Sequence, residues 1–324
     1  MPHSKQNRRS INRHLEKIDR HLLKLQNLYQ KHISQVIRVK HTSITLGQLR
    51  DNYRPHHIAI PPESLANVDK FRRFKSDSEH PLAIYGRDGG LIAYRTSLND
   101  SSLITRLTES VRWLPRQKNH QFRGINRGSY STRHLTVWSP YAKKPFISHE
   151  LKENYDANLK FLKTNDSLWN RLSDILGQIS PNTYKQFLRY PLPKDTPRFC
   201  TAWAGCVVNS GDEDPVQTKA HRDVKEAIHG FSCIVPAGNF TGGALILYDL
   251  EMVVELKAGD VFLFPDSLIH HANEAVQGER HSVIAFTQQN LFHYWERKYK
   301  SCNSNDKHAV ARHTKKTLKR IKNI

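Results

Sequence analysis

The chain has 324 residues and carries a formal net charge of +20 at pH 7. A chain of this length can bury one sizeable core together with a smaller helical part. It contains no apolar run long enough to cross a membrane, and the stretch after Met1 is basic and polar, unlike a signal peptide. We therefore expect a nuclear or cytoplasmic protein that is neither secreted nor bound to a membrane.

The positive charge is concentrated at the two ends of the chain. Residues 1–40 contain ten Lys or Arg and two acidic residues, and residues 297–324 contain ten Lys or Arg and one acidic residue. Basic segments of this kind are typical of nucleic-acid binding, because each phosphate contact releases counterions. The alternative is a pair of solvated tails that serve nuclear import or solubility. We favour contact with nucleic acid through these basic termini.

Residues 1–55 are expected to form a basic amphipathic helical extension. Apolar residues recur there at alternating intervals of four and three, which is the spacing of a heptad seam. Because the seam is short, we favour a helix that packs on the core. The alternatives are a helix that forms a homodimer and a helix that lies along nucleic acid. The seam consists of Ile11, Leu15, Ile18, Leu22, Leu25 and Tyr29.

Residues 56–200 are predicted to be the helix-rich, mixed N-terminal part of the main domain. Aromatic side chains in its loops could stack on bases, but isolated aromatic residues are more often core residues, so we assign them no role. A β-hairpin is expected at about 82–96. Helices are expected near 101–113, 149–163 and 166–190, the last interrupted at Pro181.

Residues 201–299 have the pattern of a β-rich core, and residues 300–324 form the basic C-terminal tail. Short apolar runs, rich in β-branched and aromatic residues and separated by Gly, Pro or Asp, are typical of a sandwich or barrel. Their density predicts a double-stranded β-helix, or jelly roll, within an α+β protein whose helices brace the outer sheet. The runs are 204–208, 231–235, 244–248, 253–256, 261–264 and 283–286.

A pattern of metal ligands lies inside this core. His221 and Asp223 form a His-x-Asp pair, and His271 follows fifty residues later. Two imidazoles and one carboxylate suit a non-haem iron(II) that keeps positions open for an organic acid and oxygen. Arg280 is placed to bind a carboxylate of that acid, because a guanidinium grips carboxylates in a two-pronged way. We expect His221 and Asp223 at the end of one strand and His271 on a late strand beside it.

Other histidines compete with this assignment. A second His-x-acid pair, His14 and Glu16, lies in the heptad-patterned helix without partner ligands and is interpreted as a solvated face. His270 precedes His271, and neighbouring residues on a strand point to opposite faces, so only one of them can reach the metal. The nine-residue interval to Arg280 favours His271. The remaining alternative is two exposed loop histidines without a metal.

The segment from His221 to Tyr299 resembles the core of an Fe(II)/2-oxoglutarate-dependent dioxygenase. More narrowly, it is similar to the TET/J-binding-protein-like oxygenases that are abundant in fungi. The chain departs from the family pattern between residues 123 and 145, where a glycine-rich run is absent. The stretches that carry the resemblance are 221–223, 241–250, 258–260, 271–273 and 278–282.

The resemblance implies a set of ligands and cofactors. It assigns His221, Asp223 and His271 as ligands of Fe(II). It assigns Arg280 as the anchor for the far carboxylate of 2-oxoglutarate, with Ser282 sharing that carboxylate through its hydroxyl. O2 is then the co-substrate, and 2-oxoglutarate is converted to succinate and carbon dioxide while the protein supplies geometry and shielding.

The resemblance also implies a substrate. TET-like enzymes oxidise the methyl group of 5-methylcytosine, so we expect a methylated base in DNA rather than RNA, with N6-methyladenine as the alternative. A base in a duplex must be flipped out to reach a buried iron. Glu226 and Gln288 are candidate contacts because both can hydrogen-bond a Watson–Crick edge. Alternatively, they are polar residues at the barrel mouth that contact no ligand.

Two other classes of function stay open. One is the same chemistry on a protein side chain or a small molecule, and the other is a non-catalytic nucleic-acid-binding module on an oxygenase scaffold. The intact set of ligand residues argues against the second. The four cysteines show no paired metal-binding spacing and predict reduced thiols; they are Cys200, Cys206, Cys233 and Cys302.

Overall fold

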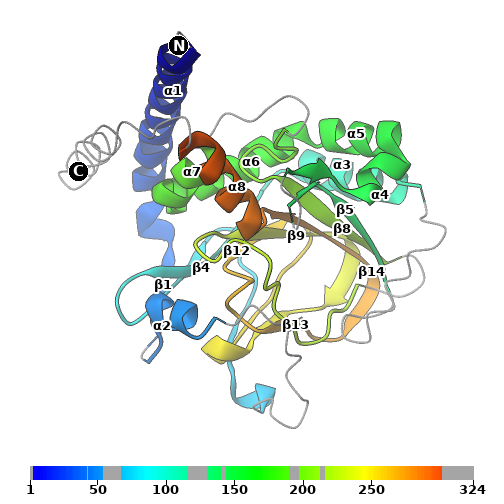
Figure 1. Ribbon diagram of the computed structural model, residues 1–324. Coiled ribbons are helices and arrows are strands. Elements are labelled where there is room, and N and C mark those ends of the chain that lie inside the picture. The colour runs from blue at the N-terminus through cyan, green and yellow to red at the C-terminus, as the bar shows by residue number, and fades with distance from the viewer. Residues whose placement is uncertain are drawn as a thin grey trace.

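Two β-sheets face each other, and helices cover the outer side of the larger sheet (Figure 1). This arrangement confirms the predicted α+β class with a jelly-roll core and a helical N-terminal segment. The predicted basic tail beyond Lys300 lies outside the described part of the chain. The computed structural model describes residues 3–41, 43–53, 67–115, 130–139, 144–189, 197–211 and 216–300.

The larger sheet has eight strands, whose spatial order is β1 (Ile37–Lys40), β3 (Leu82–Tyr85), β4 (Leu91–Ser97), β12 (Asp260–Phe264), β9 (Ser232–Gly242), β14 (Val276–Phe286), β8 (Gly205–Ser210) and β5 (Ser131–Leu135). Strands β9 and β14 pair antiparallel along most of their length. Successive side chains alternate between the two faces. On β12, Phe262 and Phe264 therefore face the second sheet, whereas Val261 and Leu263 face the helices.

The smaller sheet closes the other side of the jelly roll. Buried side chains from both sheets, including Leu247 and Val254, fill the space between them together with the two phenylalanines of β12. A two-stranded sheet, β6 (Val137–Trp138) and β7 (Phe146–Ile147), lies beyond β5. In spatial order the smaller sheet contains β13 (His271–Asn273), β10 (Leu245–Leu247), β11 (Met252–Val254) and β2 (Arg72–Phe74).

All helices except α2, whose Leu49 packs in the core between the sheets, form a second layer of the core against the outer face of the large sheet. Their ends follow local signals: Asp100 caps α3 by accepting from Ser102 and Leu103, and Pro181 occupies the first turn of α7. The helices are α1 (His3–His32), α2 (Leu46–Asp51), α3 (Ser101–Arg112), α4 (His149–Glu153), α5 (Tyr155–Thr164), α6 (Asp166–Ile179), α7 (Pro181–Leu188) and α8 (Gln289–Lys300).

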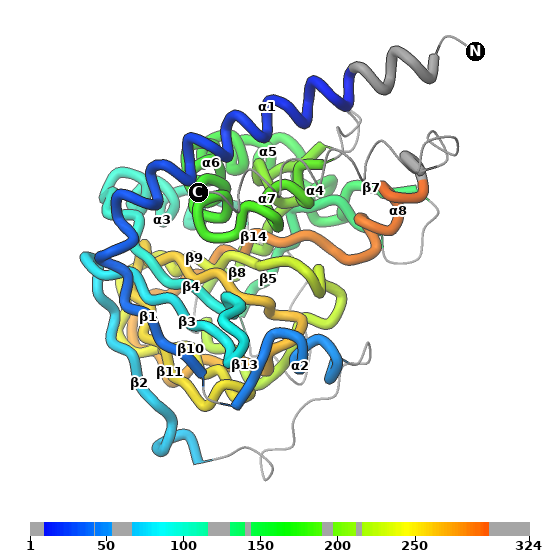
Figure 2. The backbone as a smooth tube through the Cα atoms, turned by 90° about the vertical axis from the view of Figure 1, so that its left-hand side faces the viewer, coloured from blue at the N-terminus to red at the C-terminus, as the bar shows by residue number. Residues whose placement is uncertain are grey.

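Helix α1 runs across α6 and α7 on the outside of this layer (Figure 2). Ile18, Leu22 and Leu25 of its heptad seam are buried in the same core as α6 and α7. The favoured interpretation, a helix packed on the core, is thus confirmed. Since the seam is buried within the chain, it gives no support to a homodimer through this helix. Within the described residues, no helix is both long and apolar enough to cross a membrane.

Two strands are longer than the apolar runs predict, and the sequence does not predict five others: β1, β2, β5, β6 and β7. The second half of β9 and the first half of β14 are polar or glycine-rich, so hydrophobic runs mark only their buried halves. Strand β5 has no apolar run, because Leu135 is its only apolar residue and its Thr132 and His134 line a cavity. The predicted strand end at His221 is wrong: His221 forms only an isolated bridge to His271, and the residues on either side of it belong to no strand.

The packing of α1 can be tested with two leucines of the same helix. Leu25 is 3% exposed and Leu23 is 52% exposed. Leu25→Ala is expected to lower the free energy of unfolding by about 2–4 kcal/mol, because it leaves a cavity against α6. Leu23→Ala is the control and should change it by less than about 0.5 kcal/mol. Urea denaturation measures both, and equal losses would contradict the observed packing.

Candidate active site

Two histidines distant in sequence are joined by their backbones. The N–H of His221 donates to the carbonyl of His271 (3.0 Å), and the N–H of His271 donates to the carbonyl of His221 (2.9 Å). Each residue is 4% exposed. This reciprocal pair fixes the turn-rich segment 216–230 against β13 and brings the two imidazole rings to a centroid distance of 4.2 Å.

The ring orientations leave one nitrogen of each histidine facing the same point. The Nδ1–H of His221 donates to the carbonyl of Lys219 (2.7 Å), and that of His271 donates to the carbonyl of Ile269 (2.9 Å). A carbonyl can only accept, so in the neutral imidazole the proton is on Nδ1 and Nε2 carries the lone pair that a metal ligand requires. Asp223 Oδ2 lies 3.6 Å from Nε2 of His221 and 3.8 Å from Nε2 of His271.

The three side chains form a cluster that can hold one metal ion. Their ligand atoms all lie within 4.8 Å of one another. Two neutral imidazoles and one carboxylate on one side of an ion are the donor set of non-haem iron(II) sites with open coordination positions. The residues present therefore fit the metal that the sequence predicts.

His270 is directed to a different partner. Its ring Nδ1 lies 3.1 Å from Oδ2 of Asp249, and its backbone N–H donates to the same carboxylate oxygen (2.5 Å). The adjacent His271 points the other way and packs edge-on against Phe264. Of the two competing histidines, the structure therefore brings His271 into the cluster and leaves His270 outside it.

Arg280 on β14 is a buried cation. It is 1% exposed, and no acidic side chain in the described part of the chain forms an ion pair with it. One Nη donates to the carbonyl of Val216 (2.6 Å), whereas its buried Nε has no hydrogen-bond partner. Burial lowers the pKa of Arg280 to about 10. A buried charge with unused donors is costly unless an anion binds it, so this residue fits the carboxylate of a 2-oxoacid.

Polar side chains from neighbouring strands extend this end of the site. Asn209 donates to the hydroxyl of Ser282 (3.2 Å), and Thr132 donates to the side-chain oxygen of Asn209 (3.0 Å). Gly243 lies close by with a φ of +69°, and a Cβ there would approach Nε of Arg280 to 3.2 Å. The absence of a side chain at Gly243 therefore leaves room for the guanidinium.

One cavity of about 520 Å³ joins the cluster to Arg280. That volume is in the range of roughly 300–1,000 Å³ found for small-molecule sites. The cavity is lined by every residue that the sequence singles out: His221, Asp223, His271, Arg280, Ser282, Glu226 and Gln288.

Glu226 and Gln288 lie together on the cavity wall, joined by an isolated antiparallel bridge. The side-chain oxygen of Gln288 accepts from the backbone N–H of Ser139 (3.1 Å). Because this contact uses the oxygen and orients the amide, the NH2 group of Gln288 is the part that can donate a hydrogen bond to a ligand. The pair thus presents a carboxylate acceptor beside an amide donor.

The same cavity is also lined by residues for which the sequence gave no functional assignment. His134 Nδ1 lies 3.0 Å from Oε1 of Glu150. The rings of His134 and Trp138 are tilted against each other, with centroids 5.1 Å apart. Trp138 in turn contacts Phe286, with ring centroids 6.1 Å apart. These side chains come from β5, β6, α4 and β14, and all four line the cavity. They provide an aromatic surface and a polar pair next to the candidate metal ligands.

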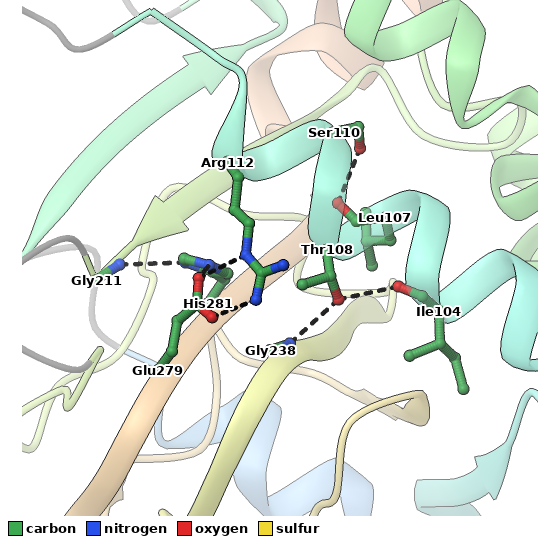
Figure 3. Close-up of polar contacts among 9 residues, drawn as sticks. All are labelled: Ile104, Leu107, Thr108, Ser110, Arg112, Gly211, Gly238, Glu279 and His281. Atoms are coloured by element: carbon green, nitrogen blue, oxygen red, sulfur yellow. Dashed lines mark hydrogen bonds and ion pairs between the residues drawn. The ribbon is translucent and has the colours of Figure 1, made fainter.

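A polar network braces β14 on the face away from the cavity (Figure 3). Glu279 accepts from Arg112 of α3 (Nε, 2.8 Å) and from the ring of His281 (2.9 Å). These two contacts, that with Arg112 first, hold the pKa of Glu279 down at about 2. Thr108 of α3 also accepts from the N–H of Gly238, the residue that pairs with Arg280. Helix α3 is therefore tied to both strands at the position of Arg280.

The chain resembles known proteins in sequence and in fold. No family model matches the chain. The bifunctional helicase and thymine dioxygenase JBP2 of Leishmania braziliensis is 27% identical over 139 residues, a match that covers 41% of this chain and 12% of that protein. The chain thus spans only a small part of that relative. The structure of NgTET1 in complex with 5mC DNA aligns with a TM-score of 0.53 and 16% identity, over 68% of this chain and 83% of that one.

The predicted resemblance to TET/J-binding-protein-like oxygenases is confirmed by these two similarities, one in sequence and one in fold. The jelly-roll fold, the His-Asp-His cluster and the buried arginine together form an arrangement that suits Fe(II)- and 2-oxoglutarate-dependent chemistry.

Neighbouring histidines provide a matched test of the cluster. His271→Ala is expected to abolish binding of one equivalent of Fe(II) or Co(II), because it removes one of three ligands. His270→Ala should retain that binding, since its ring faces Asp249. Anaerobic metal titration followed by equilibrium dialysis measures both variants. Loss of the metal in His270→Ala with retention in His271→Ala would reverse the assignment.

The brace on β14 can be tested through the affinity for 2-oxoglutarate. Arg112→Gln removes the contact with Glu279, while Arg106→Gln removes an exposed arginine of the same helix. Because exposed ion pairs typically contribute roughly 0.2–1 kcal/mol, Arg112→Gln should weaken 2-oxoglutarate binding by about 1.5- to fivefold. Arg106→Gln should leave it unchanged. Calorimetry with metal-loaded protein measures the affinity, and identical values for the two variants would contradict a bracing role.

Proposed function

We propose that this protein is an Fe(II)- and 2-oxoglutarate-dependent dioxygenase that oxidises a methylated base in nucleic acid, with 5-methylcytosine as the preferred base. One observation carries the proposal: a single cavity joins a His-Asp-His cluster, a buried arginine and a donor–acceptor pair suited to a base edge. The first two elements suit the oxygenase chemistry, and the third suits the substrate.

Each element has a distinct role in this proposal. His221, Asp223 and His271 hold Fe(II), and Arg280 with Ser282 holds the far carboxylate of 2-oxoglutarate. When bound, these two groups supply the activation of O2, coupled to conversion of 2-oxoglutarate into succinate and carbon dioxide. The protein contributes orientation and the exclusion of water, because the ligand residues other than Asp223 are almost completely buried.

The pair on the cavity wall favours particular bases. A carboxylate at Glu226 accepts a hydrogen bond from an exocyclic amino group, and the NH2 of Gln288 donates to a ring nitrogen or carbonyl. Cytosine offers an amino group beside acceptors, and adenine offers an amino group beside a ring nitrogen. Thymine offers a carbonyl where Glu226 needs a donor. The pair therefore supports 5-methylcytosine first and N6-methyladenine second, and it disfavours thymine.

An aromatic surface is available for a flipped base. Trp138 and Phe286 lie side by side on the wall of the cavity, and His134 contacts Trp138. A base taken out of the duplex loses its stacking neighbours, and aromatic side chains replace them. Stacking of this kind tolerates different bases, so selectivity falls to the hydrogen-bonding pair.

The basic termini are proposed to contact the nucleic-acid backbone, DNA in preference to RNA. On α1, exposed basic side chains follow one another at intervals of three, four and seven along the face opposite the buried seam. Such a stripe binds phosphates without reading sequence. A nuclear location is proposed with it. The stripe consists of Arg13, Lys17, Arg20, Lys24 and Lys31.

The reaction and its substrate class can be tested in one experiment. Iron-loaded protein is incubated with 2-oxoglutarate and duplex DNA that contains 5-methylcytosine, N6-methyladenine or neither. We expect succinate formation to rise with 5-methylcytosine and nucleoside mass spectrometry to detect the oxidised base. Succinate formation without an oxidised base would reject the proposed substrate in favour of a protein side chain or a small molecule. If neither succinate nor an oxidised base formed, the proposal that the protein is a dioxygenase would be rejected.

A single substitution tests how the base is read. Glu226→Gln replaces one acceptor oxygen by an NH2 donor, which can face the carbonyl of thymine. The ratio of kcat/KM for 5-methylcytosine to that for thymine is expected to fall by about ten- to a hundredfold, since such contacts contribute roughly 1–3 kcal/mol of discrimination. Glu153→Gln, on the exposed side of α4, is the control. An unchanged ratio in Glu226→Gln would exclude Glu226 as a base contact.

A further inference from the structure

A second, smaller cavity lies beside the candidate active site. Its volume is about 170 Å³, well below the roughly 300 Å³ at which small-molecule pockets begin. The chain from Asp223 to Phe231 connects the two cavities: its first residues line the large one and its last residues line the small one. Two adjacent residues are divided in the same way: Asp266 lines the large cavity and Pro265 lines the small one. The small cavity is lined by Leu46, Arg50, Leu91, Ser180, Thr183, His229, Gly230, Phe231 and Pro265.

Two nitrogen-containing side chains, those of Arg50 and His229, face this small cavity. Arg50 of α2 is partly buried, and its Nε is shielded from solvent without a hydrogen-bond partner. His229 stands at the rim, and burial together with the Arg50 charge lowers its pKa. Burial also lowers the pKa of Arg50, an effect that nearby Asp88 opposes without forming an ion pair. No acidic residue is among those that line the cavity in the described part of the chain.

Hydroxyl groups complete the polar lining. Ser180 donates to the hydroxyl oxygen of Thr183 (2.8 Å), so the proton of Thr183 remains available to donate to a ligand. A guanidinium, an imidazole and a hydroxyl donor without a carboxylate among them form a set that binds an oxyanion. Arg is suited to phosphate in particular, because its planar fork binds two oxygens at once.

We infer that the small cavity binds a backbone phosphate of the nucleic-acid strand whose base enters the large cavity. This inference rests on the proposed function. The two cavities are mechanically linked, because the hydroxyl of Tyr53, just after α2, donates to the carbonyl of Val224, next to Asp223. Flipping a base carries its own backbone to the mouth of the site, and phosphate contacts there fix the register of the strand.

The inference is tested by the salt dependence of binding to duplex DNA that contains 5-methylcytosine, using the full chain. Arg50→Gln is expected to lower the slope of log Kd against log salt by about one, the contribution of one phosphate contact. Arg106→Gln removes an equally charged, exposed arginine of α3, outside the basic termini, and should keep the wild-type slope. His229 is exposed at the rim, so His229→Gln is expected to leave the fold intact and to reduce the affinity for this DNA. A slope in Arg50→Gln equal to that of Arg106→Gln would overturn the inference.

Inorganic phosphate serves as a second probe and separates two kinds of failure. At constant ionic strength, phosphate in place of chloride should raise the Tm of the wild type more than that of Arg50→Gln. If the wild type bound no nucleic acid, the proposed function would fail, and an Arg50-dependent shift would then assign the cavity to a free phosphate instead of a strand. Equal shifts in the two proteins, with an unchanged DNA slope, would reject the site altogether.

Discussion

The candidate active site depends on a pair of backbone hydrogen bonds between His221 and His271. These bonds join a turn-rich segment to a short strand of the smaller sheet, across fifty residues of sequence. Each imidazole is then fixed by a second hydrogen bond to a carbonyl two residues earlier in the chain. With both rings held in this way, Asp223 reaches the same point from a single turn. The jelly roll matters for function because it holds these two segments side by side.

The other end of the cavity carries an energetic cost that a ligand can relieve. Burying Arg280 with no acidic partner among the described residues removes a charge from water, and helix α3 braces its strand and the neighbouring strand β9. Helix α3 holds Glu279 through Arg112 and holds Gly238 through Thr108. A dicarboxylate that bridges the metal cluster and Arg280 would satisfy both ends at once. The site thus lowers the stability of the protein without ligand in a place where ligand binding can restore it, which is common at functional sites.

Sequence patterns predicted the parts of this protein in which local chemistry decides the structure. Apolar runs marked most core strands, the heptad seam of α1 predicted its packing, and ligand spacing singled out His221, Asp223 and His271, which the structure brings together. The wall formed by His134, Glu150 and Trp138 was not predicted. These residues meet the site only because β5 pairs with β8 and because α4 packs on β5. Pairing between segments some seventy residues apart leaves no local signal in the sequence.

The central claim is that one ligand spans the metal cluster and Arg280 within a single cavity. The most direct measurement is the affinity for 2-oxoglutarate, determined by anaerobic calorimetry with metal-free protein and with protein loaded with Fe(II). If the ligand contacts both ends, the metal must tighten its binding, and by reciprocity 2-oxoglutarate must tighten binding of the metal by the same factor. We expect at least about a tenfold effect, equivalent to about 1.4 kcal/mol. Equal affinities with and without Fe(II) would contradict the account.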